Sequence, residues 1–227
     1  QISNLASGYG QSQILHELNL DVAKKEIVAV MGRNGMGKTT LFKSLMGILP
    51  QWKGQVSVDG HDVSALETHE RVERGIAYVP QGRMIFPSMT VLENIQTGLP
   101  ASARGKVPED LYALFPVLYD MQSRKGGNLS GGQQQQLAIA RALATNPKVL
   151  LLDEPTEGIQ PNIIQQIGRV ISYLKGRGDM AIVLVEQYFE FAYDLADQFY
   201  VLKRGAVAME GSKAALTKDS LRATVSV

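Results

Sequence analysis

Four short apolar runs, separated by segments of helical character, constrain the fold of this chain more than any other feature. The runs are rich in Val, Ile and Leu and cover residues 27–31, 76–79, 149–152 and 181–185. Runs of this length and composition indicate strands that are buried on both faces. Helices are expected between them, over residues 38–46, 133–144 and 162–174. This alternation predicts an α/β fold with a largely parallel central sheet.

Two regions depart from this alternation. Residues 1–22 and 54–58 are expected to form shorter, exposed strands that make an antiparallel β flank. Residues from about 90 to 140 are predicted to be a helical subdomain inserted into the α/β core, with breaks at Pro100, Pro108 and Pro116. The tail over 201–211 indicates a hairpin that turns at Arg204-Gly205, followed by a final helix. The 227 residues are therefore expected to be one domain.

Composition excludes several classes of function. The net charge is +1, from 23 basic and 22 acidic residues, so the electrostatic footprint of a nucleic-acid-binding protein is missing. The chain has no cysteine, which excludes disulfides, thiolate metal sites and cysteine nucleophiles. Its first residues lack the pattern of a secretory signal, and its apolar runs are far shorter than the roughly 20 residues of a spanning helix. We expect a soluble chain.

A glycine-rich stretch follows the first apolar run and precedes a helical segment. It matches the spacing G-x-x-x-x-G-K-[ST] and consists of Gly32, Arg33, Asn34, Gly35, Met36, Gly37, Lys38, Thr39 and Thr40. In this strand–loop–helix context the glycines let backbone N–H groups turn inward, and the helix N-terminus adds partial positive charge. Lys38 would supply a cation for the outer phosphates, and the Thr39 hydroxyl would join the shell of Mg²⁺. The stretch predicts a nucleotide-binding phosphate loop.

A pair of carboxylates ends the apolar run at 149–152. Asp153 and Glu154 would lie at the C-terminal edge of the sheet, where ligands of open α/β sheets bind. Alone, such a pair is more often a helix cap or a solvated edge. Beside a phosphate loop, Asp153 is expected to face the metal, and Glu154 to orient or deprotonate the attacking water.

A second glycine-rich helix start lies at Leu129, Ser130, Gly131, Gly132 and Gln133. Ser130 and Gln133 fit a capping box, which is a purely structural interpretation. Two glycines at a helix start are harder to explain by capping, and they favour close approach of the backbone to a ligand. The chain therefore carries two candidate anion sites.

These three motifs, in this order, resemble those of the ATP-binding cassette (ABC) ATPases over nearly the whole chain. The resemblance implies a P-loop NTPase fold, the cofactors ATP and Mg²⁺, and ATP hydrolysis coupled to transmembrane transport. It also implies a head-to-tail dimer in which Leu129–Gln133 closes over the nucleotide held by the partner's loop. Tyr9 looks like the aromatic that stacks on adenine, and Gln81 like the loop glutamine that reaches the metal together with Thr39 and Asp153. Residues 82–89 would then lie near the docking surface for a membrane subunit.

The chain departs from the family pattern after its fourth apolar run. The family usually has a His there that contacts the γ-phosphate, whereas this chain has Gln187, which can donate a hydrogen bond but cannot take up a proton. The predicted catalytic residues are therefore Lys38, Glu154 and Gln187, with the proton acceptor at Glu154.

Finer features narrow the resemblance to the ATPases of bacterial importers for branched-chain amino acids and related solutes, closest to the urea and short-chain amide branch. They are the loop sequence Gly-Arg-Asn-Gly-Met-Gly-Lys at 32–38, Val79-Pro80-Gln81-Gly82-Arg83, Ile85-Phe86-Pro87 and Val185-Glu186-Gln187. Such a chain would sit peripherally on the cytoplasmic face of the bacterial inner membrane. It would pair with a second copy or a related ATPase subunit, bind integral membrane permease subunits, and work indirectly with a periplasmic solute-binding protein. A branched-chain amino acid importer and a lipid-exporter type of cassette are the alternatives.

Overall fold

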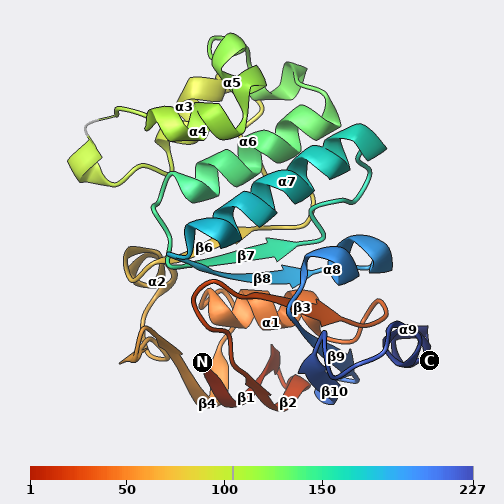
Figure 1. Ribbon diagram of the computed structural model, residues 1–227. Coiled ribbons are helices and arrows are strands. Elements are labelled where there is room, and N and C mark those ends of the chain that lie inside the picture. Colours follow the sequence, from red (N-terminus) through yellow and green to blue (C-terminus); the bar gives the residue numbers. More distant parts are fainter. Residues whose placement is uncertain (104, 227) are drawn as a thin grey trace.

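A six-stranded sheet forms the centre of the computed structural model, which describes residues 1–103 and 105–226 (Figure 1). The strands run in the order β10-β9-β3-β8-β7-β6. Those from β9 to β6 pair in parallel, and β10 joins β9 antiparallel at one edge. Their bounds are β3 (Ile27–Met31), β6 (Ile76–Val79), β7 (Val149–Asp153), β8 (Ala181–Val185), β9 (Gln198–Lys203) and β10 (Ala206–Ser212). The predicted parallel sheet is confirmed.

Alternate residues of the central strands enter two separate hydrophobic clusters, one on each face of the sheet. In β3, Ala29 belongs to one cluster, and Val28 and Val30 belong to the other. In β7, Leu150 and Leu151 divide in the same way. Successive strand side chains point to opposite faces. Both faces of the central sheet are therefore covered, which explains why the sequences of these strands are continuously apolar.

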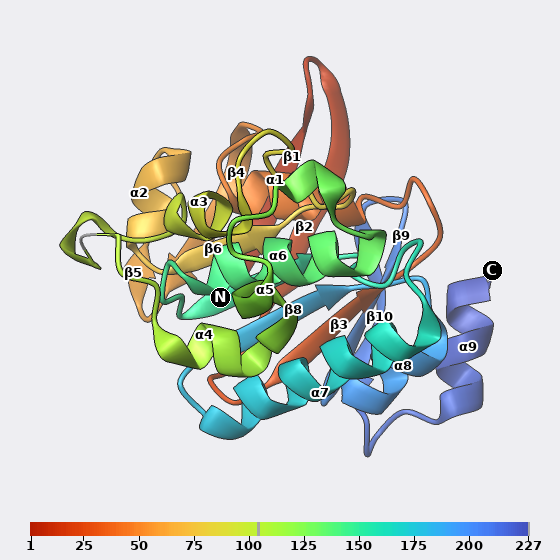
Figure 2. The ribbon, with the colours of Figure 1, turned by 90° about the horizontal axis from the view of Figure 1, so that it is seen from above.

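Helices α3 to α7 cover the upper face of the sheet in Figure 1, and α6 and α7 also lie over its strands when seen from above (Figure 2). Prolines start several of these helices: Pro108 is the N-cap of α4, while Pro116 and Pro161 occupy the first positions of α5 and α7. Proline fits there because the first N–H groups of a helix lack intrahelical partners. The bounds are α3 (Val91–Gln96), α4 (Glu109–Leu114), α5 (Pro116–Asp120), α6 (Gly131–Leu143) and α7 (Pro161–Arg177), with 3-10 turns at Ala101–Ala103 and Gly126–Asn128.

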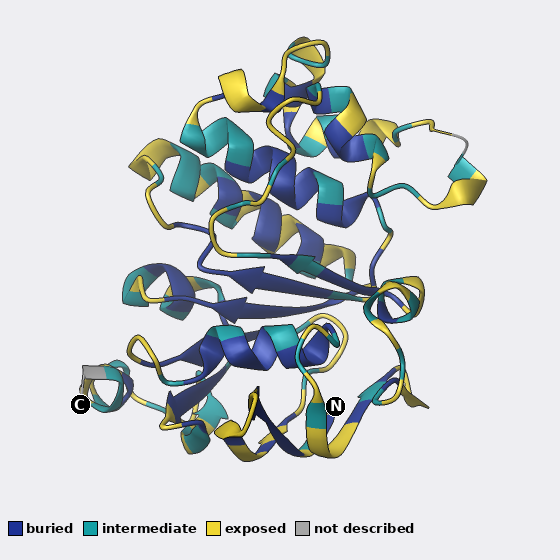
Figure 3. Ribbon diagram, turned by 180° about the vertical axis from the view of Figure 1, so that it is seen from behind, coloured by how far each residue is buried: buried dark blue, intermediate teal, exposed yellow. Residues whose placement is uncertain are grey.

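A four-stranded antiparallel sheet, in the order β2-β1-β4-β5, lies on the other side together with α1. It confirms the antiparallel flank, but the expectation of shorter strands is wrong, because β1, β2 and β4 are eight or nine residues long. Many of their residues are exposed, as expected, but each strand also has buried residues. Leu5, Leu15 and Leu18 are fully buried in the cluster shared with Phe42 of α1. Figure 3 shows buried stretches beside exposed ones along the strands of this flank. Irregular register, with bulges between β1 and β2, hides this buried face from a simple alternation pattern. The elements are β1 (Ile2–Tyr9), β2 (Ser12–Leu20), α1 (Lys38–Leu45), β4 (Gln51–Val58), β5 (His61–Asp62) and α2 (Thr68–Glu73).

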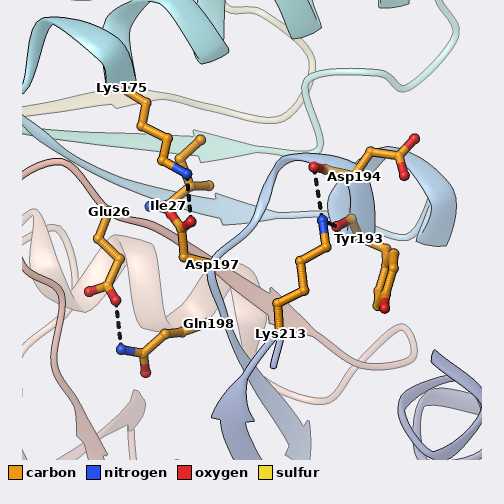
Figure 4. Close-up of polar contacts among 8 residues, drawn as sticks. All are labelled: Glu26, Ile27, Lys175, Tyr193, Asp194, Asp197, Gln198 and Lys213. Carbon is orange, nitrogen blue, oxygen red and sulfur yellow. Dashed lines mark hydrogen bonds and ion pairs between the residues drawn. The ribbon is translucent and has the colours of Figure 1, made fainter. Parts of the chain in front are cut away.

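The C-terminal segment completes the sheet and is fastened to it by polar contacts (Figure 4). Asp197 accepts hydrogen bonds from the Ile27 N–H, at 2.9 Å, and from the Lys175 ammonium of α7. Lys213 donates to the carbonyls that end α8 (Phe189–Leu195). The β9–β10 turn has Gly205 at φ 77°, and an added Cβ would lie 1.6 Å from the Ile14 carbonyl oxygen, so only glycine fits. Helix α9 (Lys218–Ser226) follows.

Within residues 1–103 and 105–226, no helix is both long and apolar enough to cross a membrane.

Candidate active site

Four loops carry the predicted site residues, and each follows a strand of one parallel group. The strands β3, β8, β7 and β6 are consecutive neighbours in the sheet. Because they are parallel, their carboxyl ends lie along a single edge. The loop at 32–40 follows β3, Gln187 follows β8, Glu154 follows β7, and Gln81 follows β6. The sheet topology therefore brings residues from four distant parts of the sequence to one edge.

The glycine-rich loop holds its lysine inward. Gly37 precedes α1 at φ 101°, a backbone angle that favours glycine, and the helix begins at Lys38. The Lys38 side chain is 5% exposed, and its ammonium donates to the carbonyl oxygens of Gly32 at 2.7 Å and Arg33 at 2.9 Å. Burial lowers the pKa of Lys38, while the carboxylates of Glu154, Asp153 and Glu186 act in the opposite direction. A buried cation is thus positioned at a helix N-terminus, where a polyphosphate binds.

Thr39 and Asp153 lie together, as expected for a Mg²⁺ site. The Thr39 hydroxyl donates to one Asp153 oxygen at 3.4 Å, and the Tyr78 hydroxyl donates to the other at 3.1 Å. Burial raises the pKa of Asp153, and these two hydrogen bonds act against that rise. A hydroxyl and an oriented carboxylate fit the oxygen ligands of Mg²⁺, which keeps water and phosphate oxygens as its remaining ligands.

Glu154 lies between two amide groups. Its two oxygens accept hydrogen bonds from Gln187 Nε2 at 2.7 Å and from Gln81 Nε2 at 3.0 Å. Its backbone has φ 48°, a strained value for a residue with a side chain. Gln81 also donates to Glu157, at 3.1 Å. In this structure Gln81 therefore donates to the carboxylates of the 154–157 loop, and among the described residues no hydrogen bond joins it to Thr39 or Asp153.

The second glycine-rich helix start forms the capping box that its sequence predicts. Ser130 caps α6: its hydroxyl accepts from the Gln133 N–H at 3.3 Å, and its own N–H donates to the Gln133 side chain at 2.9 Å. The glycines also have packing reasons, because an added Cβ would lie 3.2 Å from the Arg83 guanidinium at Gly131 and 3.0 Å from Ile163 at Gly132. Leu129 is buried beside them.

No hydrogen bond found among the described residues joins this helix start to the 32–40 loop of the same chain. The two candidate anion sites are thus separate structures within one chain. If two chains share one nucleotide site, the 32–40 loop of one chain must meet the start of α6 of the other, so these two parts cannot be joined within one chain.

Two further predicted surfaces are exposed. Tyr9, at the end of β1, is 45% exposed, and the Lys43 ammonium lies 5.9 Å from its ring centre. Met84 and Phe86 are 65% and 45% exposed, whereas Ile85 is partly buried against the core. Stacking of Tyr9 on adenine stays a prediction.

Sequence reasoning gave no role of their own to three residues that contact the predicted residues or their loops. Tyr78 donates to Asp153, Arg83 contacts the Glu157 carbonyl at 3.4 Å, and Glu186 accepts hydrogen bonds from the loop that follows Glu154. Glu186 carries a detectable signal, because it is a charged residue that directly follows a wholly apolar strand. Tyr78 carries none, because a tyrosine in a buried strand is usually only a packing residue.

Comparison with known proteins agrees with this geometry. The family model described as "ABC transporter" matches residues 15–157. The chain is 40% identical over 211 residues to the high-affinity branched-chain amino acid transport ATP-binding protein BraG of Pseudomonas aeruginosa, covering 92% of this chain and 90% of that protein. It is 34% identical to the lipopolysaccharide export system ATP-binding protein LptB of Haemophilus influenzae, covering 95% and 91%.

A solved structure supports the same assignment. The dimeric structure of an ATP-binding cassette in a post-hydrolysis state, bound to ADP and Pi, aligns with a TM-score of 0.80 at 27% identity, covering 93% of this chain and 97% of that one. This chain therefore belongs to the ABC transporter family, as an ATP-binding cassette that hydrolyses ATP for transport.

Proposed function

We propose that this chain is the ATPase subunit of an importer for small solutes of the amino acid and amide class, with branched-chain amino acids as the first candidate. The observation that carries this proposal is the 40% identity to a branched-chain amino acid transport ATPase over nine tenths of both chains. The sequence pattern favoured the urea branch, but these relatives do not support it. Urea is therefore the second candidate solute. The likeness to LptB, at 34% identity, favours an exporter less.

The proposed roles follow from the site. Lys38 and the 32–40 loop bind the phosphates, and Thr39 and Asp153 hold Mg²⁺, which neutralises charge on the phosphates when bound. Glu154 accepts the proton of the water whose oxygen attacks the γ-phosphorus, as the bond to the bridging oxygen of ADP breaks. Gln187 orients Glu154 through its 2.7 Å hydrogen bond. Gln81 and Gln187 each donate to one Glu154 oxygen, and the second lone pair of each oxygen is left to accept from the attacking water.

The partner cassette supplies the other half of the site. Ser130 and the N-terminus of α6 close over the nucleotide of a second copy or of a related subunit, with the residues from about 90 to 140 acting as the helical subdomain that carries them. Exposed Met84 and Phe86 fit an apolar contact with a membrane permease subunit. The chain thus works at the cytoplasmic face of the inner membrane, bound to its permease.

Reconstitution of the whole transporter tests the proposal. The chain is co-expressed with its membrane subunits and a solute-binding protein, and ATPase activity is measured in nanodiscs. Leucine-loaded binding protein is expected to stimulate Mg²⁺-dependent hydrolysis several-fold, whereas urea-loaded protein is not. Stimulation by urea alone would move the assignment to the urea branch, and stimulation by a lipid without any binding protein would establish an exporter.

A further inference from the structure

Glu186 is a buried carboxylate to which the proposed roles above assign no function. It follows β8 directly and is 2% exposed. It lies between two loops of the site, the one that follows β7 and the one that contains Gln187. Among the described residues, no cation forms an ion pair with Glu186. Hydrogen bonds therefore stabilise its carboxylate.

Four donors converge on its two oxygens. Oε1 accepts from the Thr156 N–H at 3.0 Å and from the Thr156 hydroxyl at 2.7 Å. Oε2 accepts from the N–H groups of Gln187 at 3.0 Å and Tyr188 at 3.1 Å. Burial raises the pKa of Glu186, and these hydrogen bonds act in the opposite direction. Only an ionised carboxylate can accept on both oxygens without presenting a donor of its own.

These contacts close a ring around the proposed proton acceptor. Gln187 donates its side-chain amide to Glu154 at 2.7 Å, and the Glu154 N–H donates to the Val185 carbonyl at 2.8 Å. Thr156 lies two residues after Glu154, so Glu186 ties the backbone of Gln187 to the loop that carries Glu154. We infer that Glu186 is a positioning residue that holds Gln187 against Glu154 for hydrolysis. This inference rests on the roles proposed above for those two residues.

The chemistry of Glu186 explains why an amide cannot replace it. In Glu186→Gln, one oxygen becomes an NH₂ group. If it faces Gln187 and Tyr188, both hydrogen bonds from their N–H groups are lost; if it faces Thr156, the bond from the Thr156 N–H is lost, although the hydroxyl can turn to accept. In either orientation at least one N–H group is left unpaired in a buried site. A shift of about 1 Å in a catalytic group can cost about a hundredfold in rate, so the effect should appear in turnover. ATP binding should persist, because the Lys38 loop is untouched.

A double-mutant cycle separates positioning from general support of the fold. Glu186→Gln is expected to lower kcat about 30-fold, within the range of a lost positioning group, while the Kd for ATP changes less than about threefold. In a Gln187→Ala background, the same substitution should lower kcat by no more than about threefold, because the group it positions is already gone. An equal loss in both backgrounds would overturn the inference, as would a wild-type kcat in Glu186→Gln.

Thr156 offers a second test if Glu186→Gln fails to fold. Thr156→Val removes only the hydroxyl that donates to Glu186 and should lower kcat several-fold, and Thr156→Ser should restore most of that loss. A wild-type kcat in Thr156→Val, or no recovery in Thr156→Ser, would count against the inference. Failure of the proposed function is distinguishable, since it appears in the wild-type transporter as no stimulation by leucine-loaded binding protein.

Discussion

Glu154 accepts hydrogen bonds from two glutamine amides, and neither of these partners changes charge with pH. In many cassettes the position of Gln187 holds a histidine, whose imidazole titrates near neutral pH. At this position the present chain therefore relies on hydrogen bonding alone.

Placing a histidine at position 187 is expected to make kcat depend on pH relative to the wild-type chain. In Gln187→His the imidazole would lie beside the Glu154 carboxylate, and an opposite charge raises the pKa of histidine above its ordinary value of about 6.5. As the pH falls through that raised pKa, the imidazolium pairs with Glu154 and weakens it as a proton acceptor. The ratio of variant to wild-type kcat should thus fall from about pH 9 to about pH 5.5. A ratio independent of pH would show that Gln187 does not act on Glu154.

Tyr78 is expected to tune the metal site through Asp153. Tyr78→Phe removes the 3.1 Å hydrogen bond to the carboxylate, and loss of such a supporting contact typically weakens metal affinity by about tenfold or more. The Mg²⁺ concentration at half-maximal ATPase activity should rise by about that factor, with little change in kcat at saturating Mg²⁺. Tyr173→Phe, on the exposed surface of α7, is the matched control. Identical Mg²⁺ curves for the two variants would remove Tyr78 from the site.

At the residue scale, the sequence predicts which residues gather at the site better than it predicts their contacts. Spacing places Lys38, Asp153 and Glu154 correctly at the edge of the sheet, because glycine loops and strand ends fix where the backbone goes. It does not show that Gln81 contacts Glu154, since side-chain hydrogen bonds depend on the approach of two loops that are distant in sequence.

The elements most important for the site are the parallel strands, because their order places the loops side by side. β3 is held at its start by Asp197, which accepts from the Ile27 N–H and the Lys175 ammonium (Figure 4). This one side chain joins β3, α7 and the start of β9. The strand that precedes the phosphate loop is thus fixed from two directions.

Asp197→Ala should destabilise this junction. It removes the hydrogen bond to the Ile27 N–H and an ion pair whose side chains are 34% and 36% exposed. We expect a loss of about 1–2 kcal/mol in the free energy of unfolding, mostly from the hydrogen bond. Urea unfolding should show a lower midpoint with an unchanged m-value. Asp120→Ala, at an exposed position at the end of α5, is the control. A midpoint equal to that of the control would mean that the junction contributes nothing.

At the scale of elements, the central strands are predictable because burial on both faces leaves a continuous apolar run. The sequence predicts that the flank is antiparallel, but it does not predict which of its residues are buried. The reason is that the bulges in β1 shift the side on which residues such as Leu5 lie. Helix starts at Pro116 and Pro161 follow from proline chemistry, but their positions over the sheet depend on tertiary packing.

The whole molecule carries the two halves that we propose for an ATP site, but its described hydrogen bonds do not join them. The Lys38 loop lies at the edge of the sheet, while Ser130 starts α6 on the helical face. A complete site therefore needs two cassettes. Bound ATP should then hold the two subunits together, and ATP hydrolysis should let the subunits separate.

Light scattering of Glu154→Gln in saturating Mg²⁺-ATP tests this claim most directly. The variant keeps the phosphate loop and the start of α6 but cannot accept the proton, so its mass should double when ATP is added and the dimer should persist. Ser130→Asp in the same background keeps a good N-cap but adds negative charge opposite the phosphate, and should remain a monomer; Ser130→Asn, a neutral cap, should still dimerise. A Glu154→Gln chain that binds ATP yet stays monomeric, alone and with its natural partner cassette, would contradict the account.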